Sequence, residues 1–281
     1  MHPTRTAITV TPLTPAFAAE IGGVDLSQPL SDDAFRTIVD AWHRHGVLRF
    51  RDQPIDSEHL KSFSARFGSL QIHIHREFLD PVHPEVLLLS NLKRPDGSPI
   101  GLAETGRRWH SDLQYARVPC IGSALFGERT PTVGGDTEFA CMTAAYEALP
   151  EATKRRIDGL VAIQSYSQTT RDGVREAREK VVPDVTHPAV LVHPATGRRA
   201  LYVSEGMTKG FVGVPEDEGR ELIRELVGHA TRPEFTWAQQ WRPRDLILWD
   251  NRAVMHRATP YDTSQVRHMK RTTIMPAFAG I

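Results

Sequence analysis

The sequence predicts a mainly β protein in which a double-sheet β barrel or jelly roll carries helices packed on its outside. Two observations predict this fold class. Short apolar runs, separated by Gly, Pro, Asp and Asn, outnumber the helix-like segments. The runs also do not alternate with helices in the way that a repeated βαβ wrap requires. A chain of 281 residues can form one domain of this kind, so we expect a single domain over residues 1–281.

Three segments have the apolar spacing of helices, namely 31–45, 56–67 and 215–229. Ser31 is a suitable N-cap for the first of them. Pro215 stands at a first-turn position of the third. Each segment shows an apolar stripe along one face, so we expect three amphipathic helices that pack against the sheets.

Short apolar or alternating runs between turn residues predict the strands. We expect the charged stretch 168–188 to be an exposed helix or a mobile loop, with a lid over a site as an alternative. The expected strands are 46–50, 85–90, 107–115, 121–128, 136–140, 160–166, 189–193, 245–250 and 271–275.

Charge and cysteine content exclude several classes of partner. Lys plus Arg equals Asp plus Glu at 34 each, which gives neither the basic face of a nucleic-acid binder nor a polybasic membrane surface. We found no signal-peptide pattern and no stretch of about 20 apolar residues. Cys120 and Cys141 are expected to be free thiols in a reducing compartment. We therefore expect a cytoplasmic protein that binds a small molecule, without nucleic acid or membrane.

A His-x-Asp pair lies in the predicted strand 107–115. His110 and Asp112 are two residues apart, so both side chains would project from the same face of a strand. One imidazole and one carboxylate are two of the three ligands in the facial triad that binds iron(II). His83-Pro84-Glu85 has a similar pattern, but its central proline favours a surface turn.

A third ligand must come from a distant segment, and His256 is the best candidate. It follows the apolar strand 245–250 closely, so a hairpin could return it to the barrel. His229 lies at the end of a predicted surface helix, where a cation suits the helix dipole. His268 lies on the opposite side of its strand from the nearby arginines. The alternative for His256 alone is an ordinary core or surface histidine.

Two arginines near the C-terminus could bind anions. Arg267 and Arg271 share one parity of the last predicted strand, so both guanidinium groups could face inward. Buried guanidinium groups need anionic partners, and Arg binds carboxylates in a bidentate fork. Thr137 follows a Gly-Gly turn and could donate its hydroxyl to the same carboxylate as Arg267. The alternatives are pairing with protein acids, outward-facing arginines and a purely structural threonine.

Taken together, these motifs resemble the TauD/TfdA family of iron(II)- and 2-oxoglutarate-dependent oxygenases, named after taurine and chlorophenoxyacetate dioxygenases. The resemblance covers nearly the whole chain, and the spacings of His110 to Thr137 and of His256 to Arg267 and Arg271 are similar to those of the family. The segments that carry it are EIGGVDLSQPL (20–30), GVLRFRDQPI (46–55), FGSLQIH (67–73), WHSD (109–112), GGDTEFA (134–140), WDNRAVMHRA (249–258) and RHMKRTT (267–273).

The resemblance implies a double-stranded β-helix core and a dioxygenase that consumes O2 and 2-oxoglutarate. It implies iron ligation by His110, Asp112 and His256. It also implies that Arg267, helped by Thr137, binds the distal carboxylate of 2-oxoglutarate. Succinate and CO2 would be the coproducts of hydroxylation. Relatives in such a family often form dimers or tetramers, so a homo-oligomer is one option and the oligomeric state stays open.

For the primary substrate, the resemblance implies contacts with Arg271, His73 and Trp109. A small organic anion fits these residues, and a sulfonate, sulfate ester, aryloxy acid or amino acid stays open. The segment 74–76 reads Ile-His-Arg, where sulfonate-using members have a Pro-x-aromatic sequence. This departure indicates a substrate shaped differently from taurine. The alternative classes are a non-catalytic or differently metallated jelly-roll binding protein, and an oxygenase of carrier-bound substrates.

Overall fold

A computed structural model describes residues 7–103, 105–166 and 182–277 of the chain. Its largest sheet has seven strands, and every neighbouring pair in it is antiparallel except the β2–β3 pair. In spatial order the strands are β1 (Thr9–Pro12), β2 (Ala19–Gly22), β3 (Val47–Phe50), β13 (Asp245–Asp250), β5 (Gly122–Arg129), β15 (His268–Ile274) and β4 (Leu87–Ser90).

A second, three-stranded sheet faces the first and closes the jelly roll. It consists of β12 (Thr236–Gln239), β6 (Thr137–Cys141) and β14 (Val254–Ala258). One apolar cluster joins the two sheets, with Phe139 and Val254 from the small sheet and Leu125, Ile247 and Trp249 from the large one. The mainly β, double-sheet fold predicted from the sequence is therefore confirmed.

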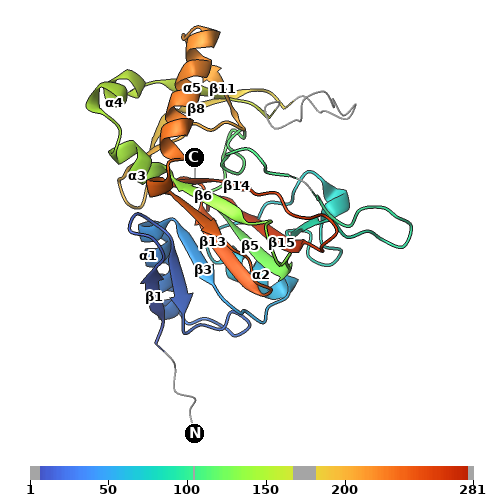
Figure 1. The fold of residues 1–281 in the computed structure, drawn as a ribbon. Coiled ribbons are helices and arrows are strands. Elements are labelled where there is room, and N and C mark those ends of the chain that lie inside the picture. Colours follow the sequence, from blue (N-terminus) through green and yellow to red (C-terminus); the bar gives the residue numbers. More distant parts are fainter. Residues whose placement is uncertain (1–6, 104, 167–181, 278–281) are drawn as a thin grey trace.

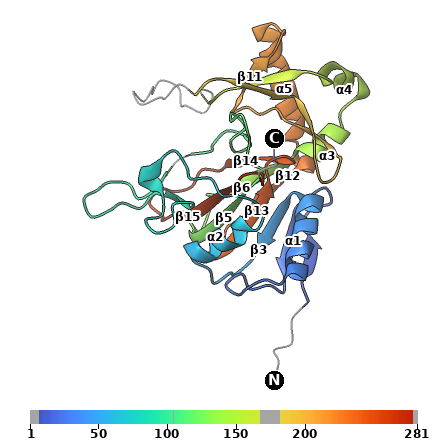
Figure 2. The same cartoon turned by 180° about the vertical axis from the view of Figure 1, so that it is seen from behind.

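Strand β13 explains why one apolar run is nearly continuous. Leu246 and Leu248 pack on the outer face of the large sheet against α1 (Asp32–His45) and α2 (Ser57–Ala65). Ile247 and Trp249 point to the opposite face, between the sheets. Both faces are covered, so apolar residues are favoured at every position. Figure 1 and Figure 2 show α1 and α2 beside this sheet.

The other helices gather at the opposite end of the molecule. Helix α5 (Glu216–Ala230) packs with α3 (Met142–Glu147) in a separate apolar cluster, and α4 (Glu151–Ile157) lies at the same end (Figure 1). Two small sheets complete this region. They consist of β7 (Val161–Gln164), β8 (Val185–Pro188) and β11 (Thr208–Phe211), and of β9 (Val190–Val192) and β10 (Arg199–Leu201).

The three predicted helices are confirmed as α1, α2 and α5. Helix α1 begins after Ser31, whose hydroxyl accepts a hydrogen bond from the backbone N–H of Ala34, and ends at Gly46, which has a φ of 69°. A left-handed glycine is a common helix C-terminus. Two short 3₁₀ helices, Arg76–Phe78 and Pro233–Phe235, were not expected.

Two predictions of local structure were wrong. Residues 107–115 do not form a strand, because only His110 makes a bridge and residues 112–115 form a turn. Leu113 has a φ of 52°, a left-handed conformation that cannot continue a β ladder. Of the stretch 168–188, residues 168–181 lie outside the described part, and the end is strand β8 rather than a helix or loop. Within the described ranges, no helix is both long and apolar enough to cross a membrane.

Candidate metal and cosubstrate site

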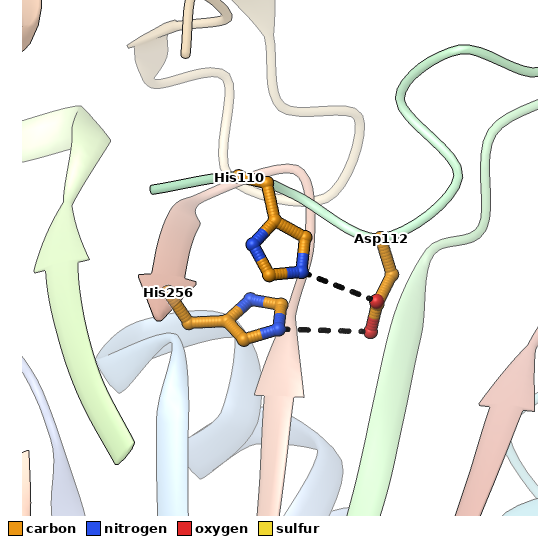
Figure 3. A group of neighbouring side chains, drawn as sticks. All are labelled: His110, Asp112 and His256. Atoms are coloured by element: carbon orange, nitrogen blue, oxygen red, sulfur yellow. Dashed lines mark ion pairs between the residues drawn. The ribbon is translucent and has the colours of Figure 1, made fainter. Parts of the chain in front are cut away.

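The two histidines of the predicted triad are joined through their backbones. The N–H of His110 donates to the carbonyl of His256 at 3.0 Å, and the N–H of His256 donates to the carbonyl of His110 at 2.8 Å. His256 belongs to β14, so this bridge attaches the segment before Asp112 to the small sheet. The two imidazole centroids are 4.3 Å apart, and Figure 3 shows both rings turned toward Asp112.

Asp112 completes a compact group of three possible metal ligands. Its Oδ1 lies 3.8 Å from His110 Nε2, and its Oδ2 lies 3.9 Å from His256 Nε2 (Figure 3). All three ligand atoms lie within 4.8 Å of one another, and no other such group was found among the described residues. An ion midway between atoms 3.8 Å apart is about 2 Å from each, which is an ordinary metal–ligand bond length.

The protonation states in this group suit a metal. The Nδ1 of His110 lies 2.8 Å from the carbonyl oxygen of Arg108, so Nδ1 carries the proton and the lone pair of Nε2 faces the site. Burial, reinforced by His110, lowers the pKa of His256 to about 3, so this imidazole is neutral at ordinary pH. Burial opposes ionisation of Asp112, but Arg271 and the two histidines hold its pKa well below the ordinary value. Two imidazoles and one carboxylate form the donor set of a facial iron(II) triad.

Arg271 and His73 lie close to the triad. Arg271 Nη1 donates to Asp112 Oδ1 at 3.1 Å, and its Nε is buried without a hydrogen-bond partner among the described residues. His73 comes from the segment that pairs with β15 through the N–H of Gln71 and the carbonyl of Thr273. Burial and the nearby charge of Arg271 lower the pKa of His73 to about 4. Together these groups form a cationic, hydrogen-bonding wall beside Asp112.

Arg267 is a buried cation with no ion pair among the described residues. Its side chain sits just before β15 and is 7% exposed. Its Nε donates to the carbonyl of Gly135 at 3.4 Å, and the guanidinium lies 5.9 Å from the ring centre of Tyr261. Burial lowers the pKa of Arg267 to about 10. A buried guanidinium without a carboxylate partner is costly, which is the signature of a site for an anionic ligand.

Thr137 lies at the start of β6, two residues after the glycine that contacts Arg267. Its buried Oγ1 accepts a hydrogen bond from the indole N–H of Trp241 at 3.1 Å. A hydroxyl that accepts one bond can still donate its own hydrogen. Thr137 thus lies two residues from the carbonyl that Arg267 contacts, and a carboxylate shared by the two side chains stays a prediction.

Trp109 is packed in an apolar cluster with Ala140 and Met255, and the guanidinium of Arg257 lies 4.7 Å from its ring centre. Its contact with a substrate stays a prediction.

The other histidines considered as ligands lie away from this group. His229 bonds to the carbonyl of Ala145, His268 faces Glu128 at 3.9 Å, and His83 of the expected turn lies 3.2 Å from Glu58.

Two residues next to Asp112 were missed in the sequence. Ser123 donates its hydroxyl to Asp112 Oδ2 at 2.7 Å, and Asn251 accepts a hydrogen bond from the backbone N–H of Asp112 at 3.0 Å. Asn251 follows β13 directly, and the sequence suggested only a turn there. Ser123 lies inside β5 and carries no motif that would reveal its role.

Comparisons with known proteins agree with this geometry. Residues 9–273 match the family described as taurine catabolism dioxygenase TauD, TfdA family. The alpha-ketoglutarate-dependent 2,4-dichlorophenoxyacetate dioxygenase of Cupriavidus pinatubonensis is 32% identical over 96% of this chain and 98% of its own length. The alpha-ketoglutarate-dependent sulfate ester dioxygenase of Pseudomonas putida is 32% identical over 94% of this chain and 88% of its own length.

Solved structures are similar over the same extent. A taurine dioxygenase from Burkholderia xenovorans is 36% identical, with a TM-score of 0.82, over 95% of this chain and 89% of that one. AAD-2 in complex with Mn(II) and N-oxalylglycine is 34% identical, with a TM-score of 0.78, over 96% of this chain and 97% of that one. The chain belongs to the TauD/TfdA family. It is an oxidoreductase of the 2-oxoglutarate-dependent dioxygenase class.

Proposed function

We propose that His110, Asp112 and His256 hold the iron(II) ion of this 2-oxoglutarate-dependent dioxygenase. One observation carries the proposal. Three side chains contribute ligand atoms that lie within 4.8 Å of one another in a buried site, although His256 is far from His110 and Asp112 in the sequence. The carbonyl of Arg108 holds the proton of His110 on Nδ1, which leaves the lone pair of Nε2 for a metal, and His256 is a neutral imidazole.

Arg267 and Thr137 are proposed to bind the distal carboxylate of 2-oxoglutarate. The support is a buried guanidinium that has no ion pair among the described residues and contacts Gly135, two residues before a threonine whose hydroxyl still has a hydrogen to donate. A bidentate guanidinium contact would fix the orientation of the cosubstrate as well as its affinity. The iron, when bound, activates dioxygen so that 2-oxoglutarate is cleaved to succinate and CO2 and a substrate C–H bond is hydroxylated.

The primary substrate is proposed to be a small organic anion. The support is the position of Arg271 and His73 beside Asp112, where a guanidinium and a neutral imidazole can both donate hydrogen bonds to anionic oxygens. Relatives are named for aryloxy acids and sulfate esters, and both classes carry an anionic group that a guanidinium can bind. Trp109 is proposed to support the substrate side of the site.

The test combines a spectrum with a product assay. Anaerobic addition of iron(II) and 2-oxoglutarate should give a weak visible charge-transfer band. A panel of sulfonates, sulfate esters, aryloxy acids and amino acids should then be scored in air for succinate above the uncoupled background. His110→Ala and Asp112→Ala should abolish turnover and the band. Retained turnover in either variant would refute the ligand assignment.

The proposal extends to domain organisation, compartment and partners. Residues 1–281 would act as one catalytic domain in the cytoplasm, where the two free cysteines, Cys120 and Cys141, stay reduced. The balanced charge supports a small-molecule partner without nucleic acid. A homo-oligomer is one option that the resemblance to the family suggests. Sedimentation or light scattering of the purified protein would test the oligomeric state.

A further inference from the structure

A buried network of hydrogen bonds contacts the backbone and the carboxylate of Asp112. It joins Asn251 at the end of β13, Ser123 in β5 and Cys120 just before β5. Ser123 is 0% exposed and Asn251 is 2% exposed, so water does not replace these bonds. A polar cluster this deep is stable only when its members satisfy one another.

The side-chain amide of Asn251 is fully used. Its Oδ1 accepts from the backbone N–H of Asp112 and from the indole N–H of Trp249, each at 3.0 Å. Its Nδ2 donates to Ser123 Oγ at 3.1 Å and to Cys120 Sγ at 3.3 Å. Turning the amide over would place an NH2 group against two N–H donors. The surroundings therefore allow one orientation of Asn251.

Ser123 links the fixed amide of Asn251 to the carboxylate of Asp112. Its oxygen accepts from Asn251, and its only hydroxyl hydrogen goes to Asp112 Oδ2 at 2.7 Å. The bond fixes the rotation of the carboxylate about its side-chain axis. Oδ1 remains on the side of His110 Nε2, at 3.8 Å.

The same network holds the backbone at Asp112. The thiol of Cys120 donates to the carbonyl of Asp112 at 3.2 Å, and the N–H of Asp112 is held by Asn251. The next residue, Leu113, has a φ of 52°, a conformation that costs a residue with a side chain about 1–2 kcal/mol. No strand pairing secures residues 111–115, so these side-chain bonds replace a β ladder.

We propose that Asn251 and Ser123 are positioning residues that hold the Asp112 carboxylate in the orientation needed to bind the metal. This inference rests on the proposed role of Asp112 as a metal ligand. Removing a residue that orients a ligating carboxylate or histidine lowers metal affinity about 10- to 100-fold. The two residues act through Asp112 and do not touch the metal themselves.

The deciding variant is Ser123→Ala, which removes one oxygen atom and one hydrogen bond to Asp112. The matched control is Ser57→Ala, because Ser57 donates to Asp80 Oδ2 at the same distance of 2.7 Å, at the start of α2. Mn(II) affinity is measured by calorimetry, the site geometry by the absorption spectrum of the Co(II)-loaded protein, and stability by thermal unfolding.

We expect Ser123→Ala to weaken Mn(II) binding about 10- to 100-fold and to change the Co(II) spectrum. Ser57→Ala should leave both unchanged. Wild-type Mn(II) affinity and a wild-type Co(II) spectrum in Ser123→Ala would overturn the inference, even if its melting temperature fell. Asp112→Ala in the same titration separates the two hypotheses. If Asp112→Ala also binds Mn(II) normally, the ligand assignment fails. If only Ser123→Ala does, the positioning role alone fails.

Discussion

Replacing Arg267 with Met should weaken the use of 2-oxoglutarate and leave the cosubstrate-free protein at least as stable as before. Arg267 is 7% exposed and has no ion pair among the described residues. Met keeps an apolar side chain in the space of the aliphatic stem. Stability and cosubstrate binding should change in opposite directions. The buried guanidinium destabilises the cosubstrate-free protein, whereas it stabilises the bound anion.

The magnitudes follow from burial and charge. Removing one partner of a buried, hydrogen-bonded charge pair costs about 2–5 kcal/mol. At 1.4 kcal/mol for each factor of ten, the KM for 2-oxoglutarate should rise from about 30-fold to several thousand-fold. Burial lowers the pKa of Arg267 to about 10, against an ordinary value above 12. Each unit by which the pKa of Arg267 is lowered corresponds to 1.36 kcal/mol, so the free energy of unfolding should rise by up to about 3 kcal/mol in the variant.

The assay measures succinate formation against 2-oxoglutarate concentration, and urea unfolding with and without Mn(II) and N-oxalylglycine. Arg252→Met is the matched control, because Arg252 is ion-paired with the buried Asp250 at 2.6 Å. The control should lose stability and keep its KM. A wild-type KM and a wild-type stabilisation by N-oxalylglycine in Arg267→Met would refute the assignment of Arg267.

Two further predictions concern the wall beside Asp112. Arg271→Gln should raise the KM for an anionic primary substrate about 10- to 100-fold and change the KM for 2-oxoglutarate less, through the lost hydrogen bond to Asp112; equal effects on both would contradict a substrate role. The metal-free protein should lose stability as the pH falls from 6.5 toward 4, because His73 and His256 stay neutral in the native state while both histidines take up protons in the unfolded chain. His73→Gln should reduce the slope of this dependence in urea unfolding and leave the part that His256 contributes; an unchanged slope would show that His73 does not contribute.

The sequence predicted the triad better than it predicted the local structure that builds it. His110 and Asp112 were expected to converge because a strand places alternate residues on one face. They do converge, but through one backbone bridge at His110 and a turn that includes the left-handed Leu113. Side-chain chemistry and spacing pointed to the three proposed ligands, whereas a single left-handed residue cannot be predicted from a periodic pattern.

The missed features lacked a local signal. Helices α3 and α4 have Cys141 and Pro150 as their N-cap residues, and neither side chain makes a capping hydrogen bond, so no N-cap motif in the sequence indicated these helices. Asn251 and Ser123 are 128 residues apart in the sequence and meet only because β13 and β5 are neighbours in the large sheet. Contacts such as the one between Asn251 and Ser123 depend on which strands pair in the tertiary structure, and a single sequence does not predict that pairing.

The most direct test of the account is a crystal structure of the protein with Mn(II) and N-oxalylglycine, in which anomalous scattering locates the ion. We expect one ion bonded to His110 Nε2, His256 Nε2 and a carboxylate oxygen of Asp112, with the far carboxylate of N-oxalylglycine on Arg267 and Thr137. An ion bound elsewhere, or one that leaves any of these three side chains uncoordinated, would contradict the account.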